Sequence, residues 1–486
     1  MTGMQWLIVI IIIQIIHGLG TWKLYVKAGR QAWEAFIPVY NAVVLMKIIH
    51  RPWWWTILLF LPIINLIMFP VVWVETVRSF GKTSNLDTFL AVITLGLYIL
   101  YINYTQDVTY REERSLIPKS SSGEWTSSIL FAIVAATLVH TYFLQPYVIP
   151  SSSLEKSLLV GDFLIVSKFH YGARVPMSTV AAPMVHDTIP VLKKKSYLFD
   201  DNFEERKTSW LNKLQLPYLR IPGFQTIKRN DIVVFNQPAD TLLDMNNFNP
   251  DRNYYKPIDK KTNLVKRCVG IPGDTLEVRD GYVYIDGTKN VLPDRAELQH
   301  FKTVTVNGNI NQLIKKYNIT EYAPIFSLKT EVWKDNRIQD YLEKNQVSLD
   351  IIYQDSLKTH VHGNMSQEAF NRLKFQIVNN KANINTTDKL IAGLKSDKSL
   401  KAVSPLTSNK RDYKIFPHDP NYPFNSNNFG PIYIPKKDAT VELTVSNLPL
   451  YKRVITEYED NELSVSGNQI LINGKVTTNY TFKKDY

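Results

Sequence analysis

Uncharged apolar stretches dominate the first 150 residues of the chain. They cover Trp6–Gly20, Trp53–Val74, Thr88–Gln106 and Trp125–Ile149. A helix needs about 20 mostly apolar residues to cross the hydrocarbon core of a bilayer, and each stretch reaches that length alone or with its flanks. The pattern therefore predicts four membrane-spanning helices. A shorter apolar run, Phe36–Met46, contains Pro38, and we expect it to lie in the interface or to re-enter the membrane.

The distribution of lysine and arginine predicts which face of the membrane each loop occupies. The loop from Thr21 to Pro52 and the loop before Trp125 together hold eight basic residues, whereas the opposite side holds two, Arg78 and Lys82. Because basic residues are retained on the cytoplasmic side, both basic loops are predicted to be cytoplasmic. The N-terminus and everything after the fourth stretch are then predicted to lie outside.

After Pro150 the pattern changes to short β-branched runs separated by turn residues, which predicts strands. Two of these regions read as hairpins, Leu276–Gly287 with its turn at Asp280-Gly281 and Leu463–Gly474 with its turn at Gly467-Asn468. An Asn/Lys-rich segment interrupts the strands. We predict a multi-spanning module of three helices (1–124), an anchor helix (125–149), a β domain in two parts (150–288 and 411–486) and an inserted subdomain (289–410).

Composition narrows the classes of function. The chain has 486 residues, a hydrophobic content of 45% and a formal net charge of +12, with the charges interspersed along the chain. The single cysteine excludes a disulfide framework and a cysteine-cluster zinc site within one chain. No nucleic-acid-binding motif occurs, so we expect the basic surface to be solvated or to face anionic lipid.

The stretch Ile149–Asp162, IPSSSLEKSLLVGD, places several hydroxyl groups directly after the fourth apolar stretch. A serine nucleophile requires a base, and a Ser-rich linker is the alternative interpretation. Lys266 lies in an apolar predicted strand, where burial would lower its pKa towards the range of a general base. A strand-end lysine extending to solvent is the alternative there.

Three segments together resemble bacterial signal peptidase I, the membrane-bound Ser/Lys endopeptidase. The first is IPSSSLEKSLLVGD, the second is RNDIVVF (Arg229–Phe235), and the third is VKRCVGIPGD (Val265–Asp274). The segment FNSNNFGPIYIPKK and the insert are similar to the long form of this family. The three stretches before Trp125 exceed the one or two spans usual in the family and look like an appended module.

The resemblance implies an N-terminal α-helical transmembrane region followed by a mainly-β signal-peptidase-type catalytic domain with an α/β insert. It implies Ser153 as nucleophile, Lys266 as general base, and the hydroxyl of Ser151 with the backbone N–H of Ser153 as the oxyanion hole. No metal or cofactor is expected. The implied partners are preproteins with signal peptides, the phospholipid bilayer and the secretion translocon. The implied location is the bacterial inner membrane, multi-pass, with the catalytic domain on the outer face.

Two departures from the family keep other interpretations open. Leu154, Glu155 and Lys156 replace the usual Met-x-Pro, and the family's last box, G-D-N-R-x-x-S-x-D-S-R, is absent up to Tyr486. The sequence is then either a part of a longer protein or a degenerate paralogue that serves as a membrane-anchored adaptor. Ser153 and Lys156 also fit the S-x-x-K motif of penicillin-binding enzymes, which places both residues on one helix. Lys452 is a third candidate base, since Lys452-Arg453 echoes Lys266-Arg267.

Overall fold

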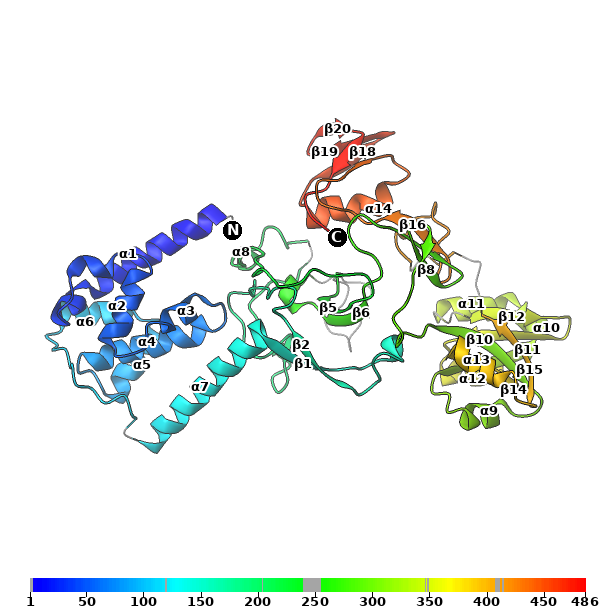
Figure 1. Cartoon of the computed structure of the whole chain (residues 1–486), viewed down its shortest axis with the longest axis horizontal. Helices are drawn as coiled ribbons and strands as arrows, with labels where there is room; N and C mark the ends of the chain where they lie inside the picture. Colours follow the sequence, from blue (N-terminus) through cyan, green and yellow to red (C-terminus); the bar gives the residue numbers. More distant parts are fainter. Residues whose placement is uncertain are drawn as a thin grey trace. The chain divides into compact units, whose positions relative to one another are not determined.

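The structure is a computed structural model that describes residues 3–118, 120–202, 204–238, 255–345, 347, 349–406, 411–412 and 415–486. It contains two compact units, whose elements are labelled in Figure 1. The first unit comprises Met1–Ser151, Val160–Ile227 and Ile232–Lys266. The second unit comprises Ser152–Leu159, Lys228–Asp231 and Arg267–Tyr486.

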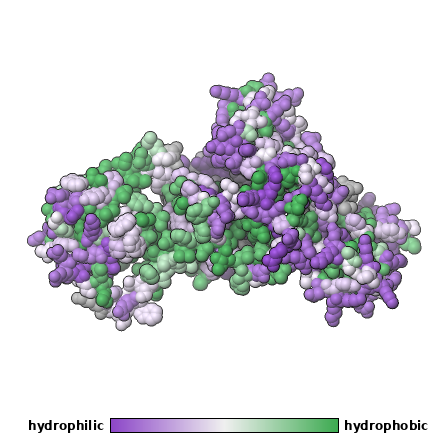
Figure 2. Space-filling model, in the orientation of Figure 1, coloured by the Kyte–Doolittle hydropathy of each residue, from purple (hydrophilic) through white to green (hydrophobic). Residues whose placement is uncertain are grey.

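The N-terminal part of the first unit is helical, as the apolar pattern predicts. It contains α1 (Gly3–Lys27), the 3₁₀ helix η1 (Ala32–Ala35), α2 (Tyr40–Ile48), α3 (Trp55–Phe60), α4 (Asn65–Ser79), α5 (Asn85–Ile93), α6 (Leu97–Thr105) and α7 (Ser121–Tyr142). Many large apolar side chains of these helices are exposed, including Ile8, Ile12 and Ile15 of α1. Figure 2 shows such apolar side chains gathered on the surface of this region, as expected for a surface that faces lipid.

The second and third apolar stretches do not form the continuous helices that were predicted for them. Trp53–Val74 is divided at Leu61–Ile64, where Pro62 removes a backbone donor and Ile63 has a φ of 71°. Thr88–Gln106 is divided at Thr94–Gly96, where Gly96 has a φ of 85°. A Cβ on Gly96 would lie 2.7 Å from the Trp73 ring, so only glycine fits there.

The fourth stretch also differs from its predicted extent. The helix α7 ends at Tyr142, and a strand, β1 (Leu144–Val148), takes up the last residues before Ile149. Strand β1 pairs antiparallel with β2 (Phe163–Ser167). The rest of the first unit holds a few short elements: β3 (Thr188–Ile189), β4 (Lys194–Lys195), α8 (Trp210–Lys213), β5 (Ile232–Asn236), the 3₁₀ helix η3 (Ile258–Lys260) and β6 (Asn263–Arg267).

The second unit contains the two predicted hairpins. Strands β7 (Thr275–Arg279) and β8 (Tyr282–Ile285) join at Asp280 and Gly281, whose φ values of 50° and 80° suit a tight two-residue turn. This sheet has the order β16-β7-β8-β9, with β16 at Phe429–Tyr433 and β9 at Thr288–Lys289. The C-terminal hairpin consists of β18 (Leu463–Ser466) and β19 (Gln469–Ile472), continued by β20 (Lys475–Thr477). Both predicted turns are confirmed.

The remaining C-terminal elements cover this second hairpin. Strand β17 (Thr440–Glu442) pairs with β21 (Asn479–Thr481), and α14 (Leu448–Arg453) runs into the π-helical turn η4 (Val454–Tyr458). Ile455 and Phe482 are among the buried residues of this core. Lys452 lies in α14 whereas Lys266 lies in a strand, so the sequence echo between them does not reflect a structural repeat.

An antiparallel six-stranded sheet lies within residues 289–410, with the order β12-β13-β11-β14-β10-β15. Its strands are β10 (Gln299–Val306), β11 (Tyr322–Lys329), β12 (Leu349–Gln354), β13 (Lys358–Gly363), β14 (Gln376–Thr387) and β15 (Leu400–Pro405). Its helices are α9 (Ile310–Lys316), α10 (Thr330–Trp333), α11 (Asn336–Lys344), α12 (Gln367–Leu373) and α13 (Asp388–Leu394). The chain therefore has an N-terminal helical region followed by a mainly-β part with an α/β insert.

Candidate active site

Ser153 lies in the loop that joins β1 to β2. At the base of this loop Ile149 N donates to Asp162 O at 3.0 Å, and Gly161 N donates to Ile149 O at 2.9 Å. Ile149 is buried, so the two ends of the loop are fixed close together. Ser153 is exposed within the short 3₁₀ helix η2 (Ser152–Leu154), and Ser151 is exposed just before it. Ser153 is thus carried by a loop whose base is closed by backbone hydrogen bonds.

Lys266 lies on β6, which pairs with β5 in a two-stranded sheet. The flanking residue Val265 is partly buried, but Lys266 itself is exposed. The apolar strand pattern predicts burial for Lys266, and the structure differs from that prediction because the residue is exposed. Ser153 belongs to the second compact unit, whereas Ser151 and Lys266 belong to the first. The pairing of Ser153 with Lys266 stays a prediction.

An ion pair within the second unit joins the second and third motifs. Arg229 Nε and Nη2 donate to the two carboxylate oxygens of Asp274 at 2.8 and 2.6 Å. Asp274 is buried and also accepts from the backbone N–H of Ile271 at 3.0 Å. The hydrogen bonds from Arg229 hold the pKa of Asp274 below its usual range. Arg229 thereby fixes the Gly-Asp turn that ends the third motif.

Backbone pairing continues this connection. Asn230 N donates to Cys268 O at 2.6 Å, and Cys268 N donates to Asp231 O at 2.8 Å. Two residues of the second motif are therefore hydrogen-bonded to Cys268, which lies two residues after Lys266.

Arg267 extends the connection to the first motif, and its role was not apparent in the sequence. Its Nη1 donates to Asn230 O at 2.8 Å, and its Nη2 donates to Ser157 Oγ at 2.7 Å. Ser157 Oγ in turn donates to Arg295 O at 3.0 Å. One guanidinium thus joins all three motifs. The signal available in the sequence was the basic pair Lys266-Arg267, of which only the lysine had an assigned role.

The insert also contacts the loop that carries Ser153. Ser152 Oγ donates to Glu321 Oε1 at 3.2 Å. Glu321 directly precedes β11, and its other carboxylate oxygen accepts from Asn385 Nδ2 of β14 at 2.7 Å. The carboxylate therefore connects the edge of the insert's sheet to the residue before Ser153.

Lys156 does not share a helix with Ser153. The 3₁₀ helix η2 ends at Leu154, and Lys156 follows it in a turn. The acylation motif of penicillin-binding enzymes needs both residues on one helix face, and the described part of this segment contains no such helix.

Lys168 is a further candidate for the general base, and the sequence did not single it out. It follows β2, and its backbone N–H donates to Phe143 O at 2.9 Å. Burial, with a smaller contribution from Arg174, lowers the pKa of Lys168 to about 8. Among the described residues no group of three or more His, Cys, Asp and Glu side chains could hold a metal ion.

Comparison with protein families assigns two regions of the chain. Residues 122–348 match the family described as signal peptidase, peptidase S26. Residues 33–113 match a family of unknown function, DUF5684. The first region contains all three motifs, and the second lies within the N-terminal helical module.

Individual relatives agree with the first assignment. The chain is 25% identical over 232 residues to signal peptidase I of Haemophilus influenzae, covering 46% of this chain and 61% of that protein. It is 24% identical over 175 residues to signal peptidase I of Buchnera aphidicola, covering 36% of each chain. It is 25% identical over 219 residues to signal peptidase I of Rickettsia akari, covering 43% and 60%. The chain thus spans about three fifths or less of the length of these relatives. No solved structure matches it.

Proposed function

Because residues 122–348 make the chain a member of the signal peptidase family, peptidase S26, we propose that it removes signal peptides from exported preproteins at a membrane surface. The observation that carries this proposal is the connection of the three family motifs through Arg229–Asp274 and through Arg267. The motifs are far apart in the sequence, yet their side chains and backbone interlock.

The proposed reaction uses a serine and a lysine. Ser153 Oγ attacks the carbonyl carbon of the scissile bond, and a neutral Lys266 Nζ accepts the hydroxyl proton. Lys266 then returns this proton to the leaving amine, and water hydrolyses the acyl-enzyme with Lys266 again acting as base. The hydroxyl of Ser151 and the backbone N–H of Ser153 stabilise the oxyanion of each tetrahedral intermediate, a contribution typically worth about 3–4 kcal/mol.

Lys266 must lose its charge for this reaction, and its exposure in the chain alone leaves it hydrated. A bound signal peptide and the adjacent bilayer would displace that water. Desolvation disfavours the charged ammonium form of a lysine relative to the neutral amine. In this proposal the substrate itself completes the environment of the base, which restricts catalysis to the membrane surface.

The anchor helix α7 supports this location. The helices α1 and α7 are long and apolar enough to cross a membrane. Strand β1 begins two residues after α7 ends, and Ser153 follows five residues after β1. The nucleophile is therefore tethered close to one membrane face, where emerging signal peptides would expose a cleavage site with small residues at positions −1 and −3.

Cleavage of a preprotein with an Ala-x-Ala site by the protein in detergent tests this function. Ser153→Ala and Lys266→Met are expected to abolish cleavage. The matched control Lys156→Ala is expected to retain it within several-fold. Binding of the preprotein without cleavage by the unmodified protein would instead indicate an adaptor. Loss of activity in Lys156→Ala but not in Lys266→Met would favour the S-x-x-K mechanism.

A further inference from the structure

The helices between α1 and α7 are too short to cross a bilayer singly. At about 1.5 Å per residue, α1 is about 37 Å long, α4 about 22 Å, and α5 and α6 about 13 Å each. The hydrocarbon core is about 30 Å thick. In the described part of the chain only α1 and α7 meet the length and composition of a span.

The two ends of the segment that contains α5 and α6 lie close together. Lys82, before α5, donates through Nζ to Gln106 Oε1, after α6, at 3.1 Å. Nearby, Arg111 N donates to Ser79 O at 2.9 Å. A single membrane crossing would separate Lys82 from Gln106 by the thickness of the bilayer. Residues 83–105 therefore form a hairpin.

The tip of this hairpin is suited to hydrocarbon. It is uncharged, and its Leu95 side chain is 73% exposed. Its backbone donors are satisfied internally, because Leu95 N donates to Val92 O, Gly96 N to Ala91 O, and Leu97 N to Thr94 O. Irregular backbone is usually excluded from the membrane interior because its polar groups lack hydrogen-bond partners. Since these three N–H groups have partners, that cost does not arise for them.

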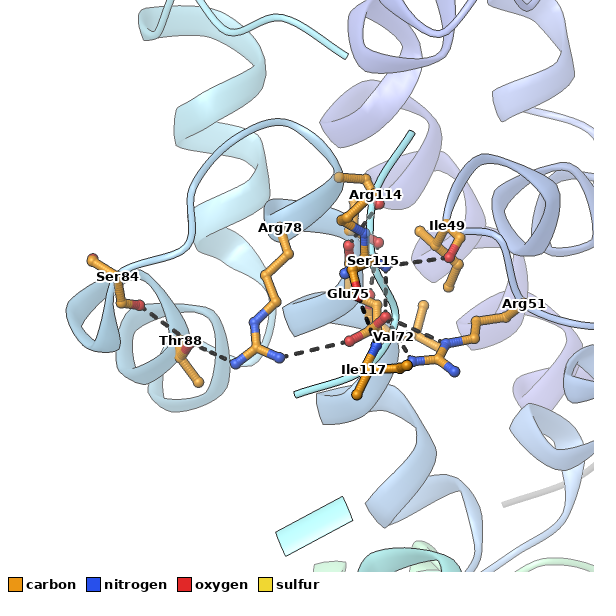
Figure 3. Close-up of polar contacts among 12 residues, drawn as sticks. Ile49, Arg51, Val72, Glu75, Arg78, Ser84, Thr88, Arg114, Ser115 and Ile117 are labelled. Atoms are coloured by element: carbon orange, nitrogen blue, oxygen red, sulfur yellow. Dashed lines mark hydrogen bonds and ion pairs between the residues drawn. The ribbon is translucent and has the colours of Figure 1, made fainter. Parts of the chain in front are cut away.

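The segment that contains α3 and α4 returns in the same way. Arg51, before α3, lies 3.0 Å from Glu75 in the last part of α4. Figure 3 shows Arg51, Arg78 and Arg114 directed at this one carboxylate, which is buried. The tip at Leu61–Ile64 is uncharged. Residues 52–74 thus form a second hairpin whose open end carries the charged side chains.

The segment between α1 and α2 forms a third hairpin of this kind. Asn41 Nδ2 donates to Gln14 Oε1 at 2.6 Å, although Gln14 lies about 20 Å from Lys27 along α1. Phe36 packs against Gly18, where a Cβ would lie 2.5 Å from its ring. At the end of α2 the chain has returned, because Ile48 O accepts from Tyr110 OH at 2.9 Å.

Residues 106–114, here called the strap, contact the open ends of all three hairpins and of α1. Lys27 Nζ donates to Val108 O at 2.8 Å, and Arg114 Nη2 donates to Glu75 Oε2 at 2.6 Å. Gln106, Tyr110 and Arg111 also belong to the strap. Their partners, given above, are Lys82, Ile48 and Ser79. The ends of α1, α2, α4 and α6 therefore lie at one level of the module.

We propose that residues 28–120 enter the bilayer from one face only, as three re-entrant hairpins packed on α1, with the acyl chains of a single leaflet as their partner. In this arrangement α1 and α7 are the spans. The nine lysine and arginine residues that the structure describes among the first 150 residues then lie on one face. Arg78 and Lys82, which a four-span arrangement places on the opposite face, cease to be exceptions to the positive-inside rule. This inference concerns the module's lipid contacts and goes beyond the proposed function.

Labelling of single cysteines by a membrane-impermeant maleimide tests the arrangement. The full chain carries Cys268→Ser and one new cysteine, and it is labelled in right-side-out and in inverted membrane vesicles. Asn85→Cys and Thr83→Cys report the start of α5, Ser115→Cys reports the end of the strap, and Ser466→Cys reports the C-terminal hairpin. All four positions are exposed.

We expect Asn85→Cys, Thr83→Cys and Ser115→Cys to be labelled from the same face and protected from the other. Labelling of Asn85→Cys and Thr83→Cys from the face opposite to Ser115→Cys would overturn the inference in favour of four spans. Ser466→Cys addresses the proposed function separately. If Ser466→Cys were labelled from the same membrane face as Ser115→Cys, the proposed peptidase domain would lie on the wrong side of the membrane for emerging signal peptides. This outcome would contradict the proposed function independently of how Thr83→Cys and Asn85→Cys are labelled.

Discussion

The guanidinium of Arg267 donates a hydrogen bond of 2.7 Å to the hydroxyl oxygen of Ser157, which is 110 residues earlier in the chain. Through its other terminal nitrogen Arg267 holds Asn230 O. The residue that follows the proposed base is therefore hydrogen-bonded to the loop that carries the proposed nucleophile.

Arg267→Ala is expected to lower kcat/KM for preprotein cleavage by roughly 10- to 100-fold, because hydrogen bonds from a charged donor are worth about 1.5–3 kcal/mol. Arg279→Ala removes an exposed arginine that pairs with Glu277 and serves as the control. Equal kcat/KM values for Arg267→Ala and the unmodified protein would show that this connection does not position the site.

Arg229→Ala is expected to lower the free energy of unfolding of the second unit by about 1–3 kcal/mol, because it leaves the buried carboxylate of Asp274 without its bidentate partner. Thermal unfolding in detergent measures this loss. Arg337→Ala breaks an exposed pair with Asp335 and serves as the control, for which we expect no measurable change in Tm.

The same pair predicts a dependence on pH. The pKa of Asp274 is lowered in the folded chain, so its stabilisation is fully present above the unfolded pKa of about 3.9 and is lost as pH falls through the lower folded value. Asp274→Asn should remove this part of the acid sensitivity. An unchanged acid transition in Asp274→Asn would contradict the assignment.

Lys168 predicts a second pH dependence, of the same sign but in the alkaline range. Its pKa is lowered to about 8, so below pH 8 the folded chain must accommodate a partly buried charge. Between about pH 8 and the unfolded value of about 10.4 the unfolded chain binds more protons, and stability rises with pH. Lys168→Met should therefore raise Tm at pH 7, and its advantage should shrink above pH 8. A Tm difference that is constant from pH 7 to pH 10 would refute this, and Lys156→Met, at an exposed position, is the control.

Glu321→Ala is expected to lower cleavage several-fold, because it frees the Ser152 side chain of the loop that carries Ser153. Ser152→Ala should have a similar effect, and the double variant should be no worse than either single one, as expected for two partners of one contact. Glu331→Ala changes an exposed glutamate of the insert and serves as control. Additive losses in the double variant would show that Glu321 and Ser152 act separately.

Local turn chemistry made the hairpins predictable from the sequence. Asp280-Gly281 and Gly467-Asn468 specify tight turns that need few long-range contacts, and both occur where predicted. The three motifs likewise indicated the family whose model matches residues 122–348. The role of Arg267 could not be predicted, because it depends on Ser157 and Asn230, which the sequence places far away.

The proposed membrane arrangement could not be predicted from the sequence, for a different reason. A hydropathy pattern is the same for a helix that crosses the bilayer and for a hairpin that turns back inside it. Only contacts such as Lys82 to Gln106, and Arg51 to Glu75, distinguish the two. Lys266 shows a related limit. An apolar strand predicts burial, but burial depends on which elements pack over the strand, and Lys266 is exposed.

The closure between Lys82 and Gln106 has a consequence for how such a protein can evolve. A segment that returns to the face it entered from leaves the orientation of the next helix unchanged. Residues 28–120 could therefore be gained, lost or exchanged as a cassette between α1 and α7 without inverting whatever α7 anchors. A cassette with an odd number of crossings would carry the domain after α7 to the other compartment. The side of the membrane on which the domain after α7 lies then depends on whether residues 28–120 make an even or an odd number of crossings. It does not depend on the identity of any side chain in them.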